Sequence, residues 1–189
     1  CADVLVTDPP YGMSYESNRT RRTSRIEGDE STRLRDEVLN LWGDRPALLF
    51  GRWSVDRPPS TRMLLTWEKG EHVGMGDLSL PWKPTTEEVY VLGSGFTGRR
   101  TTSVLRHNAI SPNFARRDHP TQKPDGLMRE LIGKCPPGVV ADPFMGSGST
   151  LVAAKAEGRK AIGIELEERY CEIAALRLAQ NVLDFGGAA

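Results

Sequence analysis

The segment Asp8-Pro9-Pro10-Tyr11 constrains this 189-residue chain more than any other feature. It directly follows Val4-Leu5-Val6, a short apolar run typical of a buried strand. Each proline lacks a backbone N–H and restricts the residue before it to an extended conformation, so the turn is stiff and its carbonyls can accept hydrogen bonds. An acid beside a carbonyl can accept both hydrogens of an NH₂ group, and the Tyr11 ring can stack on a flat ring. We therefore interpret this turn as a clamp for the exocyclic amine of a heteroaromatic base.

A glycine-rich turn between a strand and a helix predicts a cofactor site. Val139-Val140-Ala141 leads into the segment 142–150, and a helix is expected over 151–157. The glycines of this turn allow close approach of a ligand, and the N–H groups at the helix start favour a negative group. Glu165 ends the next strand and lies 19 residues after Gly146, close to the spacing at which an acid reaches ribose hydroxyls.

The same turn matches neither of two well-known phosphate-binding loops. No third glycine completes a dinucleotide fingerprint, and no lysine precedes Ser149-Thr150 as a Walker loop requires. A ligand with a ribose and a carboxylate, such as S-adenosylmethionine, therefore fits better than a pyrophosphate. Other nucleotides remain open on this pattern alone.

The remaining pattern predicts an α/β fold. We expect a loop over 12–30, helices over 31–42, 124–134 and 167–180, and strands over 47–50, 63–67, 89–92 and 161–164. Strand and helix alternate from residue 124 to residue 180, which is typical of a parallel sheet with helices on its faces. We predict one domain over residues 1–189, with a three-layer, doubly wound, Rossmann-like fold.

Composition excludes several classes of protein. No apolar stretch approaches the roughly 20 residues of a membrane span, and no secretory signal is visible, so we expect a cytoplasmic location. Cys1, Cys135 and Cys171 lie far apart without a CxxC pair. We interpret them as free thiols rather than a disulfide or a zinc site, and we expect no metal.

Positive charge is concentrated in two segments, although the formal net charge is +0. We expect both segments, 17–26 and 95–123, to be loops, and we interpret them as contacts to a phosphate backbone; solvated surface charge is the alternative. The first should lie over the Asp8 turn, and the second should flank the other side of the cleft. The candidate contacts are Arg19, Arg21, Arg22, Arg25, Arg99, Arg100, Arg116 and Arg117.

Four motifs in this order resemble the beta-class (permuted) amino-methyltransferases of DNA. The DPPY segment at 8–11 comes first, His119-Pro120-Thr121-Gln122-Lys123-Pro124 follows, and the DPF-x-G-x-G loop at 142–148 precedes Gly163-Ile164-Glu165. The strand at 63–67 with the following Glu68-Lys69-Gly70 is also similar to a segment of that family. The resemblance implies a circularly permuted S-adenosylmethionine-dependent methyltransferase fold.

The resemblance also implies an activity and a role for each matching residue. The expected reaction is site-specific methyl transfer from S-adenosylmethionine to adenine N6 in DNA, by base flipping and direct in-line transfer. Asp8 and the Pro9 carbonyl would bind the target amine, Pro10 would stiffen the turn, and Tyr11 would stack on the base. The implied cofactor-binding residues are Asp8, Thr121, Lys123, Asp142, Phe144, Gly146, Gly148, Ser149 and Glu165.

Two alternatives remain at this stage. DPPY, rather than an SPP form, favours adenine, but methylation of cytosine N4 is the alternative within the family. A non-catalytic subunit that binds DNA or cofactor is the alternative from another class, and the intact DPPY segment and glycine loop argue against it. DNA is the expected partner, with a short target-recognition segment at about 93–118. A homodimer, a cognate restriction enzyme, the recognition sequence, and a bacterial or phage origin are left open.

Overall fold

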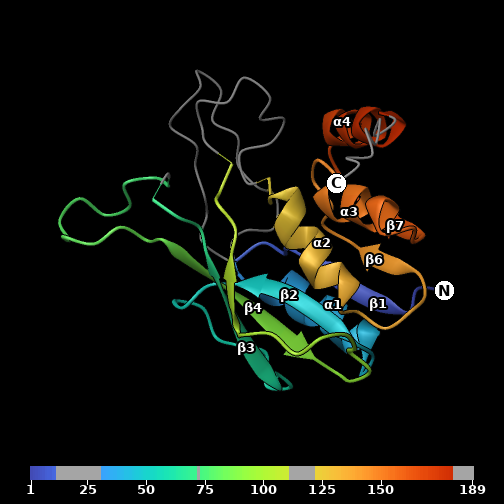
Figure 1. Cartoon of the computed structure of the whole chain (residues 1–189), viewed down its shortest axis with the longest axis horizontal. Coiled ribbons are helices and arrows are strands. Elements are labelled where there is room, and N and C mark those ends of the chain that lie inside the picture. The colour runs from blue at the N-terminus through green and yellow to red at the C-terminus, as the bar shows by residue number, and fades with distance from the viewer. Residues whose placement is uncertain (12–30, 72, 111–121, 181–189) are drawn as a thin grey trace, which may run out of the picture.

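The described strands form one mixed sheet (Figure 1). The computed structural model describes residues 1–11, 31–71, 73–110 and 122–180. The sheet has seven strands in the order β5-β3-β4-β2-β1-β6-β7. The strands are β1 (Val4–Thr7), β2 (Ala47–Gly51), β3 (Met63–Glu68), β4 (Thr86–Leu92), β5 (Val104–Arg106), β6 (Val140–Asp142) and β7 (Ala161–Gly163). The helices are α1 (Arg33–Trp42), α2 (Asp125–Gly133), α3 (Ser149–Ala156) and α4 (Glu168–Ala179).

Strand direction determines which loops meet. β1 pairs in parallel with β2 and β6, β6 with β7, and β3 with β5, whereas β4 runs antiparallel to both β2 and β3. Of the seven strands, β4 therefore runs against the other six. The carboxyl ends of β1, β3 and β6 and the amino end of β4 consequently lie at one edge of the sheet, which we call the carboxyl edge. In Figure 1 the arrows of β2 and β6 point to the left, toward this edge.

Both faces of the sheet are buried at its centre, which explains why Val4, Leu5 and Val6 of β1 are all apolar. Val4 and Val6 belong to a core that includes the apolar face of α2 and residues of α3. Leu5, between them, belongs to a second core that includes Leu39 and Trp42 of α1. Successive side chains of a strand point to opposite faces. The helices therefore cover the two faces as separate layers, and α4 packs against α3.

The structure confirms the predicted fold class and corrects details of the element boundaries. Residues 95–123 were expected to be loop, yet β5 pairs with β3 within that range. The predicted helix over 151–157 begins earlier, at Ser149, because Gly148 adopts a left-handed conformation (φ 79°) and the helix starts directly after it. The predicted loop over 12–30 lies outside the described residues. None of the helices in the described part of the chain has the length and apolar character needed to cross a membrane.

Candidate active site

The Asp8 turn lies at the carboxyl edge, directly after β1. The Asp8 side chain is partly buried, and its Oδ2 lies 2.9 Å from the Nζ of Lys123, a residue just before α2. The Tyr11 hydroxyl donates a hydrogen bond to Oδ1 of Asp8. The structure therefore brings the predicted clamp residues together and adds a cation to them.

A second carboxylate, Glu87 near the amino end of β4, completes the cluster. Its Oε1 accepts a hydrogen bond from Nζ of Lys123 at 2.5 Å and lies 3.0 Å from the Tyr11 hydroxyl oxygen, whose single hydrogen is shared between the two carboxylates. Its Oε2 lies 3.4 Å from Nζ of Lys69, which follows β3. Tyr11 and Lys123 thus both bridge the two carboxylates. We call these five residues, Asp8, Tyr11, Lys69, Glu87 and Lys123, the carboxylate cluster.

Aromatic rings support the buried ammonium group of Lys123. Its Nζ lies 4.5 Å from the ring centroid of Phe50 and 5.6 Å from that of Trp67. The two rings meet edge to face, and the Trp67 indole N–H donates to the His107 carbonyl at 2.7 Å. A cation over an aromatic face is stabilised by the ring quadrupole. The rings and the two carboxylates together compensate the loss of water around Lys123.

The same contacts set the protonation states. Burial would lower the pKa of Lys123, but Asp8 and Glu87 raise it above its usual value, so the ammonium stays charged. Burial would likewise raise the pKa of Glu87, but Lys123 and Lys69 lower it. The pKa of Asp8 is raised, chiefly by burial and further by Glu87, against the opposing charge of Lys123. Burial, with both carboxylates nearby, raises the pKa of Tyr11 well above 10, so its phenol remains a donor.

The glycine loop begins beside the Asp8 turn. Asp142, the last residue of β6, is buried and accepts a hydrogen bond at 2.6 Å from the hydroxyl of Thr7, the residue preceding Asp8. The same oxygen accepts from the backbone N–H of Phe144 at 3.1 Å. Burial raises the pKa of Asp142 to about 6, against hydrogen bonds from Thr150, Thr7 and the Phe144 N–H that lower it. One hydrogen bond therefore connects the two motifs.

The Glu165 carboxylate accepts hydrogen bonds from two backbone N–H groups, one of which belongs to the glycine loop. One carboxylate oxygen accepts from the backbone N–H of Gly146 at 3.0 Å, and the other accepts from that of Glu167 at 2.9 Å. Gly146 and Gly148 both have positive φ, at 48° and 79°. Arg177 of α4 connects that helix to the loop, because its guanidinium donates a hydrogen bond to the Ser147 carbonyl at 2.7 Å. The loop is thus held between β6, β7 and α4.

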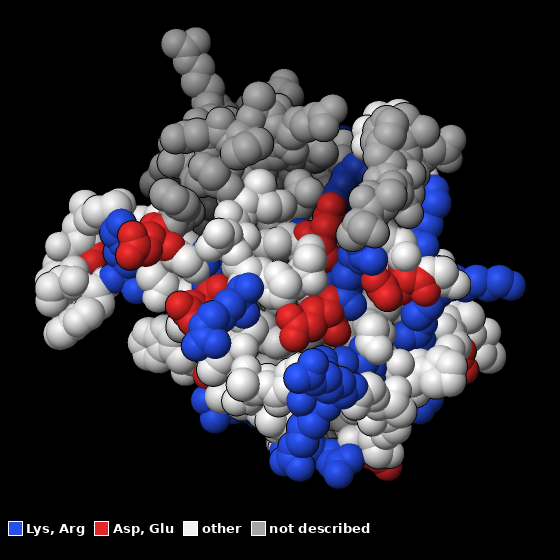
Figure 2. Space-filling view, viewed as in Figure 1, with Lys and Arg blue, Asp and Glu red and all other residues white. Residues whose placement is uncertain are grey.

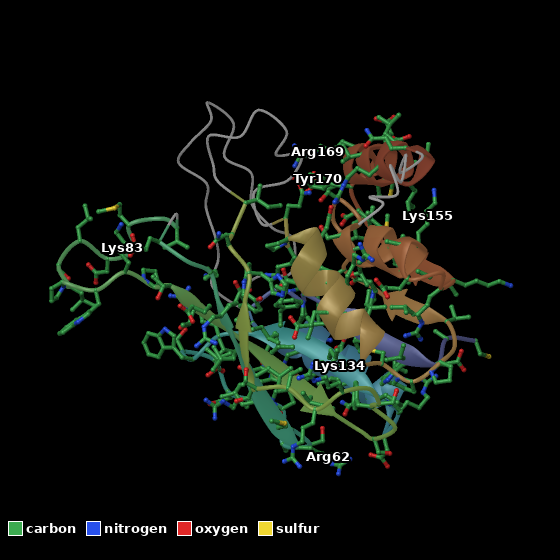
Figure 3. The ribbon with its side chains drawn as sticks, viewed as in Figure 1. Arg62, Lys83, Lys134, Lys155, Arg169 and Tyr170 are labelled. Atoms are coloured by element: carbon green, nitrogen blue, oxygen red, sulfur yellow. The ribbon has the colours of Figure 1, made fainter. Side chains whose placement is uncertain are left out.

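Other predicted site residues lie elsewhere or outside the described ranges. Thr121 and the arginines at 19, 21, 22, 25, 116 and 117 lie outside the described residues. Arg99 and Arg100 are exposed but do not flank the Asp8 turn. The Arg99 carbonyl accepts a hydrogen bond at 2.7 Å from Lys134, just after α2. That end of α2 leads into the start of β6, so it lies at the edge opposite Asp8; Figure 3 shows Lys134 there.

The expected position of the second basic segment is therefore wrong for Arg99 and Arg100. Charge alone carried no information about the edge of the sheet on which they lie. Figure 2 shows basic and acidic side chains interspersed over the described part of the face it presents. Residues 69 and 87 belong to the carboxylate cluster, although sequence reasoning assigned no role to either side chain.

Comparison with known proteins agrees with this arrangement. The family model described as DNA methylase (N6_N4_Mtase) matches residues 32–176. YubD of Escherichia coli (strain K12), a protein named as a methylase, is 30% identical over 207 residues, covering 98% of this chain and 86% of YubD. The type II methyltransferase M.ScaI of Streptomyces caespitosus is 45% identical over 81 residues, covering 42% of this chain and 25% of that protein.

Solved structures share the fold. The M1.HpyAVI–SAM complex has a TM-score of 0.67 and 23% identity, and the match covers 95% of this chain and 89% of that chain. The cytosine-N4-specific PvuII DNA methyltransferase has a TM-score of 0.72 and 14% identity, and that match covers 96% of this chain and 81% of that chain. The predicted Rossmann-like methyltransferase fold and the predicted family are confirmed. With its motifs and its sheet in agreement, the chain belongs to the N6/N4 DNA methylase family.

Proposed function

We propose that this protein transfers a methyl group from S-adenosylmethionine to the exocyclic N6 amine of adenine in DNA. The observation that carries the proposal is the hydrogen bond between Thr7 and Asp142. It fixes the residue before the amine clamp to the first residue of the cofactor loop. An amine held at Asp8 would therefore meet a ligand held by the glycine loop at the same edge of the sheet, as direct transfer requires.

The clamp addresses the chemical difficulty of this reaction. The lone pair of an amino nitrogen on a base is delocalised into the ring, which makes the nitrogen a poor nucleophile. Hydrogen bonds from both N–H groups, one to Asp8 and one to the Pro9 carbonyl, favour a pyramidal nitrogen with an available lone pair. Preorganised acceptors of this kind act without reorganising during the reaction. The Tyr11 ring would stack on the base, which must leave the duplex to reach the pocket.

The residues of the glycine loop fit the cofactor. The Gly146 and Gly148 backbones leave room for close approach, and Glu165 presents a carboxylate suited to ribose hydroxyls. Lys123, which contacts Asp8, remains a proposed cofactor ligand. When bound, S-adenosylmethionine supplies an electrophilic methyl group whose C–S bond breaks as the new C–N bond forms.

Asp8 also has a role after transfer. The methylated nitrogen carries one proton too many and must lose it. Burial has raised the pKa of the Asp8 carboxylate, so it is a better proton acceptor than an exposed aspartate. Asp8 can therefore take that proton and pass it to water. This step requires Asp8 to be ionised when the base binds.

The identity of the base rests on the DPPY form of the motif. The same clamp would hold the N4 amine of cytosine, so cytosine-N4 methylation is the alternative product. We would incubate the protein with DNA and S-adenosylmethionine carrying a deuterated methyl group, digest the DNA to nucleosides, and separate them by liquid chromatography with mass spectrometry. Labelled N6-methyldeoxyadenosine is the expected product.

The other outcomes of this assay are equally informative. Labelled N4-methyldeoxycytidine would contradict the assignment to adenine and retain the clamp. Absence of label in every nucleoside would contradict the proposed activity and favour a non-catalytic subunit.

A further inference from the structure

Glu87 receives more polar contacts from the cluster than its surface-like sequence context suggests. It precedes a second glutamate, Glu88, and both would ordinarily be interpreted as solvated acids. In β4, however, side chains alternate between the two faces, and Glu87 is in phase with Val89 and Val91, which pack in the core below α2. Its carboxylate consequently points to the face that carries Lys123 and Tyr11.

The contacts to Glu87 come from three separate parts of the chain. Tyr11 follows β1, Lys69 follows β3, and Lys123 precedes α2, and all three contact the Glu87 carboxylate. Two of these groups, the Tyr11 hydroxyl and the Lys123 ammonium, also contact Asp8. Glu87 contacts none of the cofactor-loop residues through a described hydrogen bond, so its influence on the reaction would pass through Asp8.

We propose that Glu87 is a positioning residue for methyl transfer: it holds Lys123 and the Tyr11 hydroxyl against Asp8 and competes with Asp8 for the ammonium charge. This inference rests on the proposed function. Without Glu87, Lys123 would neutralise Asp8 alone, and the Asp8 carboxylate would become a weaker acceptor for the amine hydrogens. With Glu87 in place, Lys123 is shared between two carboxylates, and Asp8 retains more of its negative charge.

The described charges around Asp8 determine the direction in which its pKa changes when Glu87 is replaced. The described titratable and charged groups that face Asp8 are Tyr11, Glu87, Lys123 and, at the end of β6, Asp142. Glu87 raises the pKa of Asp8 both by direct repulsion and by engaging Lys123. Replacing Glu87 by a neutral side chain of the same size therefore lowers the pKa of Asp8.

The test uses Glu87→Gln and steady-state kinetics of DNA methylation from pH 4.5 to pH 9. The acidic limb of kcat/KM reports the pKa of an essential group in the free enzyme, here Asp8. We expect this limb to move to lower pH by about one unit. We also expect kcat at the plateau to fall roughly 10- to 100-fold, while the KM for S-adenosylmethionine changes by less than about twofold.

Glu88→Gln is the matched control. Glu88 has equivalent partners on the opposite face of the same strand: its Oε1 lies 2.8 Å from Arg57, and its Oε2 accepts from the Tyr90 hydroxyl at 2.8 Å. A general weakening of β4 would affect both variants alike. We expect Glu88→Gln to retain the wild-type pH profile and kcat.

Each result bears on a different claim. If wild type methylates DNA but Glu87→Gln has the same acidic limb and the same kcat, the role of Glu87 is overturned and the proposed function stands. If wild type transfers no methyl group, the proposed function fails, and the role of Glu87 fails with it.

If Glu87→Gln does not fold, Glu87→Asp serves instead, because it keeps the charge and withdraws the carboxylate. Its kcat should fall, and its acidic limb should move to lower pH by less than that of Glu87→Gln because the charge is kept; an unchanged kcat would overturn the proposal.

Discussion

The buried carboxylate of Asp142 makes stability depend on pH in a direction opposite to that of a salt-bridged acid. Asp142 is only 3% exposed, and its pKa is raised from 3.8 to about 6, with burial as the largest cause. The folded protein therefore binds this proton more tightly than the unfolded chain does. The stabilisation from the bound proton is fully present below pH 3.8 and is lost as pH rises toward about 6.

The magnitude follows from the same two pKa values. Their difference is about two units, and each unit corresponds to about 1.4 kcal/mol, so the full effect is about 3 kcal/mol. Between pH 4 and pH 7 most of it is expressed, about 2 kcal/mol. Asp142→Asn removes the titration but keeps the shape. Its amide oxygen can still accept from Thr7 and Phe144, and its NH₂ can donate to the Thr150 hydroxyl.

Urea denaturation of the cofactor-free protein at a series of pH values provides the assay. We expect Asp142→Asn to gain about 2 kcal/mol relative to wild type between pH 4 and pH 7. Asp44→Asn, which changes an exposed acid at the opposite edge, is the control and should show no such trend. A constant stability difference between Asp142→Asn and wild type would refute the argument that burial controls this carboxyl group.

Three further predictions concern the site and its partner. Lys123→Met should lower the free energy of unfolding by about 3 kcal/mol at pH 8. The loss should diminish toward pH 5, because the two carboxylates left without their ammonium partner take up protons; denaturation at both pH values checks this. Gly148→Ala should lower stability by about 2 kcal/mol or more, because φ is 79° and the new Cβ would lie 2.8 Å from that of Ala174. Thermal melting with and without S-adenosylmethionine measures this loss, and an unchanged melting temperature would contradict it. Arg21→Ala with Arg22→Ala should weaken DNA binding and flatten its salt dependence by about one log–log unit for each phosphate that is no longer neutralised, with cofactor affinity retained; a parental salt slope in binding titrations would leave these arginines as solvated surface.

Local sequence patterns were sufficient for the fold and for the two motifs. β1 and β6 could be identified because each is a short apolar run that ends in an acid and a stiff or glycine-rich turn. β5 was missed because its three residues, Val104–Arg106, carry too little apolar pattern to distinguish a strand from a loop. Its pairing with β3 depends on residues about 40 positions away, which no local window contains.

The carboxylate cluster shows the same limit within the site. Tyr11 and Glu87 are 76 residues apart, and the pair Glu87-Glu88 resembles a solvated surface. A signal was nevertheless present, because period-two alternation places Glu87 on the same face as Val89. The alternation places the residue on the face covered by α2, but only the strand order shows that it lies beside the Asp8 turn.

The central claim is that Asp8 holds the reacting amine beside a separately formed cofactor site. Single-turnover methylation by Asp8→Ala, paired with calorimetric titration of S-adenosylmethionine into the same protein, tests it most directly. We expect the rate of methyl transfer to fall on the order of 10²–10³-fold or more, while cofactor binding is largely retained. Near-normal turnover in Asp8→Ala would contradict the account, because the amine would then be activated without the clamp.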